Sequence, residues 1–132
     1  MKNIILFTLL SIQLFGTELH WLHDYDKALS IAKEQNKGVY IFIGADRCRF
    51  CNILKDKTFS KKSVMLRLEK DFVPVYLSRD QHKVPSQFST KSVPRHYFVT
   101  NDGKIFYEDR GSREESGFHL LLDEVELSQM EE

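Results

Sequence analysis

The chain has 132 residues, of which 42% are hydrophobic and 29% charged, and its acidic and basic side chains balance to a formal net charge of zero. This length favours a single domain, and the composition argues against an intrinsically disordered chain. A neutral chain also lacks the basic surplus that would favour nucleic acid or an anionic membrane surface as its partner.

The N-terminal segment differs in kind from the rest of the chain. A short basic start, Met1–Asn3, precedes an uncharged and almost wholly apolar run from Ile4 to Phe15, and Gly16-Thr17 supplies small residues for cleavage. This pattern predicts a secretory signal peptide over residues 1–16 and a mature domain over residues 17–132. The run is shorter than the roughly 20 residues of an ordinary transmembrane helix, and an uncleaved N-terminal anchor is the alternative.

A helix and a buried strand open the predicted mature domain. Asp24 suits an N-cap position, and apolar side chains gathered on one face predict a helix over residues 25–37. We expect Gly38 to end this helix in the left-handed conformation. The β-branched and aromatic run over residues 39–43 then predicts a central strand that is covered on both faces.

The only two cysteines of the chain, Cys48 and Cys51, follow this strand and open a predicted helix over residues 49–58. A helix N-terminus stabilises a thiolate through unpaired backbone N–H groups and the helix dipole. A disulfide that closes so small a loop contributes only roughly 2 kcal/mol, so the spacing favours a redox site over a structural staple. Half of a zinc site is the third interpretation, but the chain offers no second ligand pair, so we expect no metal and no cofactor.

The middle of the chain predicts one more helix and a second strand. Ser60 is the expected N-cap of a helix over residues 61–69. A strand over residues 72–77 follows, and Pro74 within it indicates either an edge position or a bulge. After a polar loop, residues 85–89 are expected to form one helical turn.

The C-terminal part predicts a hairpin and a last helix. Two short strands, residues 97–100 and 104–107, flank Asn101-Asp102-Gly103, which is a strong turn signal. Ser112 begins a pattern that resembles a capping box, so we expect a helix from there to about residue 127. The whole order predicts an α/β fold with a central mixed sheet flanked by helices on both faces. The predicted apolar face of the last helix comprises Leu120, Leu121, Val125 and Leu127.

This order of elements resembles the thioredoxin fold. The Cys-x-x-Cys motif after the central strand is joined, about forty residues later, by Val93-Pro94 ahead of a strand and hairpin. The surrounding segments are similar to exported, periplasmic thioredoxin-like proteins and to the C-terminal domain of the bacterial electron carrier DsbD. The segments that are similar to these exported proteins and to the DsbD domain include Asp24–Leu29, Gly44–Asp46, Thr58–Ser60 and Asp71–Val75.

The resemblance implies a periplasmic thiol–disulfide oxidoreductase and a role for each site residue. Cys48 would be the attacking thiol and Cys51 the resolving thiol. The proline that matches Pro94 has a cis peptide bond in the family and lies beside the cysteines, so Val93 and Pro94 would bind and orient the substrate. The implied partners are client proteins with disulfides or thiols, and a membrane-bound electron donor or acceptor of the disulfide pathway.

The residues around the first cysteine depart from the family pattern. Arg47 stands where family members usually have tryptophan, and Arg49 lies inside the motif. Cations close to Cys48 are expected to favour its thiolate and lower its pKa, which makes a disulfide more oxidising. The resemblance, by contrast, favours reduction of client disulfides. Two alternatives to this reductant stay open: a DsbA-type oxidant, and a non-catalytic module that binds peptides beside Pro94.

The general base is a second departure. The family commonly buries an acidic residue behind the cysteines, whereas the matching strand position here is Phe42. The helix position that carries glutamate in the DsbD-type domain is Lys55. Asp46, Lys55 and His96 are therefore the candidates for the group that accepts the proton of the resolving thiol.

Overall fold

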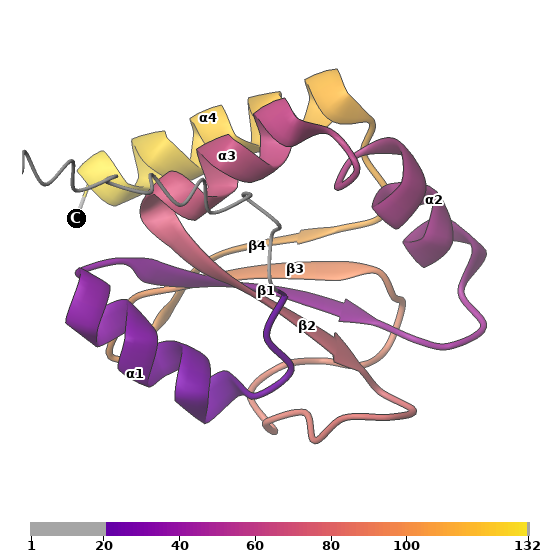
Figure 1. Cartoon of the computed structure of the whole chain (residues 1–132), viewed down its shortest axis with the longest axis horizontal. Helices are drawn as coiled ribbons and strands as arrows, with labels where there is room; N and C mark the ends of the chain where they lie inside the picture. The colour runs from indigo at the N-terminus through magenta and orange to yellow at the C-terminus, as the bar shows by residue number, and fades with distance from the viewer. Residues whose placement is uncertain (1–20, 132) are drawn as a thin grey trace, which may run out of the picture.

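The computed structural model describes residues 21–131, so the predicted signal peptide over residues 1–16 lies outside the described part. The described chain forms a mixed four-stranded sheet with the order β2-β1-β3-β4, and helices cover both of its faces (Figure 1). This arrangement confirms the predicted α/β class. In chain order the elements are α1 (Tyr25–Gln35), β1 (Gly38–Gly44), α2 (Arg49–Lys57), α3 (Lys62–Asp71), β2 (Phe72–Ser78), β3 (Arg95–Val99), β4 (Ile105–Arg110) and α4 (Glu115–Met130).

The central strand β1 organises the sheet. It pairs in parallel with β2 and antiparallel with β3, and β3 pairs antiparallel with β4. β2 is thus an edge strand, which confirms the edge position predicted from Pro74, because an edge tolerates a residue without a backbone donor. The backbone of Leu22 covers part of this edge: its N–H donates to the Pro74 carbonyl at 3.1 Å, and its carbonyl accepts from Tyr76 N–H at 2.8 Å.

The core consists of two apolar clusters, one on each face of the sheet. Alternate side chains of β1 enter opposite clusters, so the whole strand is buried and its sequence is continuously apolar. Tyr40 and Phe42 face the cluster that α2, α3 and α4 cover, and this cluster contains both cysteines. Ile41 and its neighbours face the cluster that α1 covers. The site is therefore built on the aromatic face of the sheet.

The predicted end of the first helix is wrong. Asn36, with φ of 54°, is the left-handed residue after α1, and Gly38 begins β1. Asparagine adopts this conformation more readily than most residues, so it takes the position expected for glycine. Gly38 serves close packing instead, because a Cβ atom there would lie 2.7 Å from the Val99 carbonyl oxygen.

Two local predictions in the middle of the chain are also wrong. Ser60 does not cap α3: its hydroxyl donates to the Asp56 carbonyl at 2.5 Å, and Lys61 occupies the cap position without a side-chain bond. Residues 85–89 form a turn closed by Phe88 N–H and the Pro85 carbonyl, at 3.0 Å, rather than a helical turn. In both places the residue expected to start a helix makes a local hydrogen bond instead: Ser60 bonds to a carbonyl in the last turn of α2, and the Pro85 carbonyl closes a turn.

The last helix begins later and turns a different face inward than predicted. Glu114 occupies its N-cap without a side-chain bond, so the expected capping box at Ser112 is wrong. Leu120 and Leu127, two residues of the predicted apolar face, are 62% and 61% exposed. The buried face follows the spacing i, i+3, i+4, i+7 of an amphipathic helix. It comprises Phe118, Leu121, Leu122 and Val125.

The hairpin between β3 and β4 is confirmed. Gly103, with φ of 90°, supplies the left-handed position that the turn needs, and its N–H donates to the Thr100 carbonyl at 2.9 Å. β4 then runs to Arg110, so the chain returns to the end of the sheet near which α2 lies (Figure 1). Within residues 21–131, no helix has the length and apolar character needed to cross a membrane.

Candidate functional site

The two cysteines lie at the N-terminus of α2 and form a disulfide. Cys48 is the N-cap residue, and Cys51 lies in the first turn of the helix. The Cys51 backbone N–H donates to Cys48 Sγ at 3.1 Å, so one of the unpaired donors of the helix points at this sulfur. Cys48 is 8% exposed and Cys51 is fully buried. Cys48 is thus the more exposed cysteine of the pair.

The loop before Cys48 is anchored to the end of β2. Asp46 N–H donates to the Asp80 carboxylate at 2.8 Å. The Asp46 carboxylate in turn accepts from the Ser78 hydroxyl at 2.8 Å and from the Gln81 amide at 2.7 Å. This exchange of hydrogen bonds holds the loop that presents Cys48, and it gives Asp46 a positioning task.

The other two candidates for the general base have their own partners. The Lys55 ammonium lies 4.1 Å from the centre of the Tyr76 ring. His96 is fully buried, and its ring nitrogens lie 2.6 Å from the Tyr40 hydroxyl and 2.8 Å from the Gly111 carbonyl. Among residues 21–131, no hydrogen bond joins Asp46, Lys55 or His96 to a cysteine sulfur.

His96 carries a prediction for the pH dependence of folding. Burial lowers the pKa of its imidazole, against smaller raising effects of the Gly111 carbonyl and Asp109. An unfolded histidine has a pKa near 6.5, so below about pH 6.5 the unfolded chain binds a proton that the buried imidazole does not. The free energy of unfolding should therefore keep its full value above about pH 6.5 and decrease as the pH falls below it. We expect His96→Gln to flatten this fall in urea titrations between about pH 7.5 and 5.5, whereas His119→Gln keeps it. An unchanged slope in His96→Gln would contradict the prediction.

A groove of about 560 Å³ is lined in part by residues of α2 that neighbour the cysteines in sequence, although neither cysteine is one of its lining residues. Phe50, which stands between the two cysteines in sequence and is 58% exposed, forms part of its wall. Val93 and Pro94 line it as well, and the peptide bond between them is cis. Val93 also packs against the apolar cluster that contains both cysteines. The remaining lining residues are Ile53, Ser92, Arg110, Gly111, Ser112 and Glu114.

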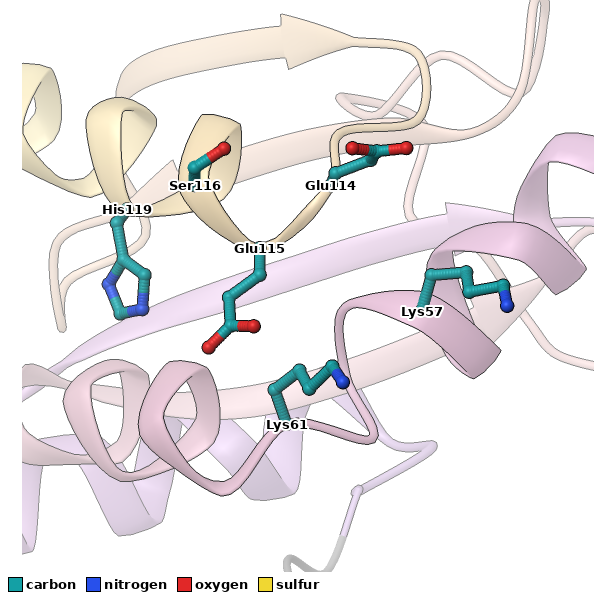
Figure 2. A pocket seen from close by; sticks show the side chains of 6 residues that line it. All are labelled: Lys57, Lys61, Glu114, Glu115, Ser116 and His119. Carbon is teal, nitrogen blue, oxygen red and sulfur yellow. The ribbon is translucent and has the colours of Figure 1, made fainter.

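A second cavity, of about 650 Å³, lies between the start of α4 and the segment that joins α2 to α3 (Figure 2). Its lining mixes charges of both signs, and Figure 2 shows Glu115 pointing towards the segment that carries Lys61. The Ser63 hydroxyl donates to the Glu115 carboxylate at 2.8 Å. Within the described residues, no group of three or more His, Cys, Asp and Glu side chains is placed to hold a metal ion.

The two arginines next to Cys48 are exposed, and neither forms an ion pair within the described residues. We expect the double substitution of Arg47 and Arg49 by alanine to raise the pKa of Cys48 in the reduced protein, because a cation within about 4–6 Å favours the thiolate. Thiolate absorbance followed against pH measures this, and Lys33→Ala, on α1, is the matched control. An unchanged titration would mean that both side chains extend into solvent.

Several groove residues were not predicted from the sequence. Phe50 has a signal in the sequence, since an aromatic residue inside the Cys-x-x-Cys motif of an amphipathic helix can stay exposed. Arg110, Gly111 and Glu114 have none, because they reach the groove through the pairing of β3 with β4 and the position of α4. The link between His96 and Gly111 is likewise a product of that pairing.

Comparisons with solved structures show that the chain has a thioredoxin-like fold. A thioredoxin from Thermus thermophilus has 22% identity and a TM-score of 0.65, covering 81% of this chain and 87% of that one. A DsbH oxidoreductase has 16% identity and a TM-score of 0.63, covering 83% of each chain. The oxidised C-terminal domain of DsbD from Neisseria meningitidis has 17% identity and a TM-score of 0.63, covering 80% and 98%. At these identities the likeness shows the fold.

Two curated proteins align with parts of the chain. An uncharacterized protein of Archaeoglobus fulgidus is 26% identical over 84 residues, which span 62% of this chain and 66% of that protein. Human Spermatogenesis-associated protein 20 is 25% identical over 61 residues, which span 46% of this chain and 8% of that protein. The family model described as Thioredox_DsbH, protein of unknown function, DUF255, matches residues 11–126. Since this match covers most of the sequence, the chain belongs to the Thioredox_DsbH family of thioredoxin-like proteins.

Proposed function

We propose that this protein is a periplasmic thiol–disulfide oxidoreductase that reduces disulfides of client proteins. The observation that carries the proposal is the Cys48–Cys51 disulfide at the N-terminus of α2, where Cys48 is the more exposed of the two cysteines and Phe50, between them, lines an open groove. A structural staple gains little from so small a loop, and a fold with two apolar clusters does not depend on one.

The reaction begins from the reduced pair. The Cys48 thiolate attacks one sulfur of a client disulfide, the bond from Cys48 to that sulfur forms, and the other client sulfur leaves as a thiolate. The Cys51 thiolate then attacks Cys48 Sγ, which forms the intramolecular disulfide and releases the reduced client. Two electrons pass from the protein to the client. A membrane-bound donor of the disulfide pathway returns them, which restores the dithiol.

The groove gives the client its place in this scheme. Val93, Pro94 and Phe50 all line it, so an extended client segment bound there would lie close to the N-terminus of α2. In this role Val93 and Pro94 bind and orient the client strand. Arg47 and Arg49 tune the pKa of Cys48 from the exposed side of the loop and the helix.

The proposed function also implies export of the protein and a division of the chain into a signal peptide and one domain. Residues 1–16 act as the signal peptide that directs export, and residues 17–132 form the thioredoxin-like domain. The basic start and uncharged apolar run of the sequence support export. Outside the cytosol a dithiol meets no reducing glutathione pool, which is why the scheme requires a dedicated electron donor.

Reduction of insulin in the presence of dithiothreitol tests the proposal. We expect the protein to accelerate the precipitation of the insulin B chain, and the double variant Cys48→Ser with Cys51→Ser to leave the uncatalysed rate. A wild-type protein that binds insulin without accelerating its reduction would be a peptide-binding module, and the proposal would be wrong.

The exposed arginines favour a second candidate, a DsbA-type oxidant. A thiolate stabilised at Cys48 would also stabilise the reduced form, and the disulfide would then pass more readily to clients. The oxidant would form disulfides in a reduced, unfolded test protein faster than it reduces insulin. Comparing both rates for one preparation therefore separates the two directions.

A further inference from the structure

We propose that His96 is a positioning residue for client binding: from inside the core it fixes the Gly111 turn that forms one wall of the groove. This inference rests on the proposed oxidoreductase function, since it concerns how the same groove holds its client. It assigns no proton transfer to His96. Its basis is a continuous line of hydrogen bonds from the buried face of the sheet to Pro94.

The first part of this line fixes the imidazole. His96 lies on β3 and is fully buried, and its Nε2 is 2.8 Å from the Gly111 carbonyl oxygen. A carbonyl oxygen only accepts, so Nε2 carries the proton. In the neutral ring Nδ1 then accepts from the Tyr40 hydroxyl, 2.6 Å away. Both nitrogens are satisfied, and the tautomer is set by groups on two neighbouring elements.

The second part of the line reaches the groove. Gly111 N–H donates to the Pro94 carbonyl at 2.9 Å, so Gly111 is held on both sides, through its carbonyl by His96 and through its N–H to Pro94. Gly111 has φ of 92°, a conformation that residues with a side chain rarely adopt. Gly111 and Pro94 both line the groove. The imidazole therefore controls the distance between the β4 end and the proline.

The aromatic packing around His96 restricts the movement of its imidazole. The Phe118 ring lies 6.0 Å from the imidazole, centre to centre, at 60°, and the Tyr40 ring lies 6.0 Å away at 22°. In the register of the sheet His96 stands opposite Phe42, so aromatic rings of β1 and α4 surround it. A ring enclosed in this way has one available position, and so does the carbonyl that it holds.

Geometry also separates this role from acid–base catalysis. Asp109 and Arg113 are the charged groups near His96, and they pair with each other through Arg113 Nε at 2.6 Å and Nη2 at 3.1 Å. Both imidazole nitrogens are occupied, and neither is bonded to a cysteine sulfur. Loss of His96 should thus disturb the binding of a client that fills the groove, and spare attack on a disulfide too small to fill it.

Two substrates separate these effects in the full-length protein, with dithiothreitol present to regenerate the reduced pair after each turnover and the uncatalysed rate subtracted. One is a disulfide-bonded peptide long enough to span the groove, and the other is bis(2-hydroxyethyl) disulfide. His96→Phe keeps a ring but removes both hydrogen bonds, and we expect its KM for the peptide to rise about tenfold, the equivalent of one lost buried hydrogen bond. Its kcat and its rate with the small disulfide should stay within about twofold of wild type. His96→Gln, which retains an N–H donor, should recover most of the loss.

A glycine pair keeps the inference testable if His96→Phe does not fold. Gly111→Ala strains the same turn from the surface, with no atom within 4 Å of the new Cβ, and should raise the peptide KM by itself. Gly103→Ala imposes the same backbone strain, at φ of 90°, at the other end of β4, where the new Cβ would lie 3.3 Å from the Tyr25 hydroxyl, and it should leave KM unchanged.

Three results would count against these proposals, and they are distinguishable. An unchanged peptide KM in both His96→Phe and Gly111→Ala would overturn the positioning role. Equal slowing of peptide and small disulfide by His96→Phe would also overturn it, because the defect would then lie in the cysteine chemistry. A wild-type protein that reduces neither substrate would refute the proposed function itself.

Discussion

Cys48→Ser is expected to abolish turnover, whereas Cys51→Ser is expected to accumulate covalent complexes with clients. The difference follows from exposure, since Cys48 is 8% exposed and Cys51 is fully buried. On the proposed mechanism, Cys48 is therefore the thiol that attacks an external disulfide. Once the mixed disulfide has formed, only Cys51 lies close enough to break it, and its removal stops the reaction there.

The complexes can be counted directly. Each variant is produced in its native compartment, free thiols are blocked with acid and alkylating agent, and cross-linked species are separated without reductant and identified by mass spectrometry. The double variant Cys48→Ser with Cys51→Ser is the matched control and should trap nothing. Equal trapping by the two single variants would contradict the assignment of roles, and absence of trapping by Cys51→Ser would contradict the exchange mechanism.

Phe118→Ala is expected to lower the free energy of unfolding by about 3–5 kcal/mol, the usual range for removing a buried aromatic ring. Phe118 is fully buried on the inner face of α4, and its ring lies 5.3 Å from that of Phe59 and 5.9 Å from that of Tyr40. The cavity left by this substitution would be enclosed by aromatic rings that have little room to close it.

Leu120→Ala provides the matched control, because it shortens an apolar side chain on the same helix that is 62% exposed. Its effect should stay within about 0.5 kcal/mol of wild type. Urea unfolding of the oxidised variants measures both values, with the disulfide intact in each. Comparable losses in the two variants would contradict the observed orientation of α4.

The parts of the fold that depend on strong local patterns were predictable from the sequence. The apolar run of β1, the Cys-x-x-Cys motif and the hairpin turn at Gly103 each carry their own signal, and together they predicted the mixed sheet. Pro74 marked the edge strand because its missing N–H restricts where it can stand in a sheet. Each of these features depends on the properties of only a few neighbouring residues.

The features that were predicted wrongly or missed are those that depend on tertiary packing. Leu120, Leu121 and Leu122 are consecutive, so their spacing alone does not say which two turn inward, and Phe118 settles the orientation only when α4 lies on the sheet. Pairing of β3 with β1 and β4 decides that His96 reaches both Tyr40 and Gly111, contacts far apart in sequence. No local pattern carries this information.

The reduction potential of the Cys48–Cys51 pair, equilibrated against glutathione in the purified domain, tests the central claim most directly. The proposed reductant requires a value between roughly −200 and −270 mV, in the range of glutaredoxins and thioredoxin. A value below about −300 mV would mark a structural disulfide and contradict a redox function. A value near −120 mV would match the oxidising end of the scale and contradict the reducing direction.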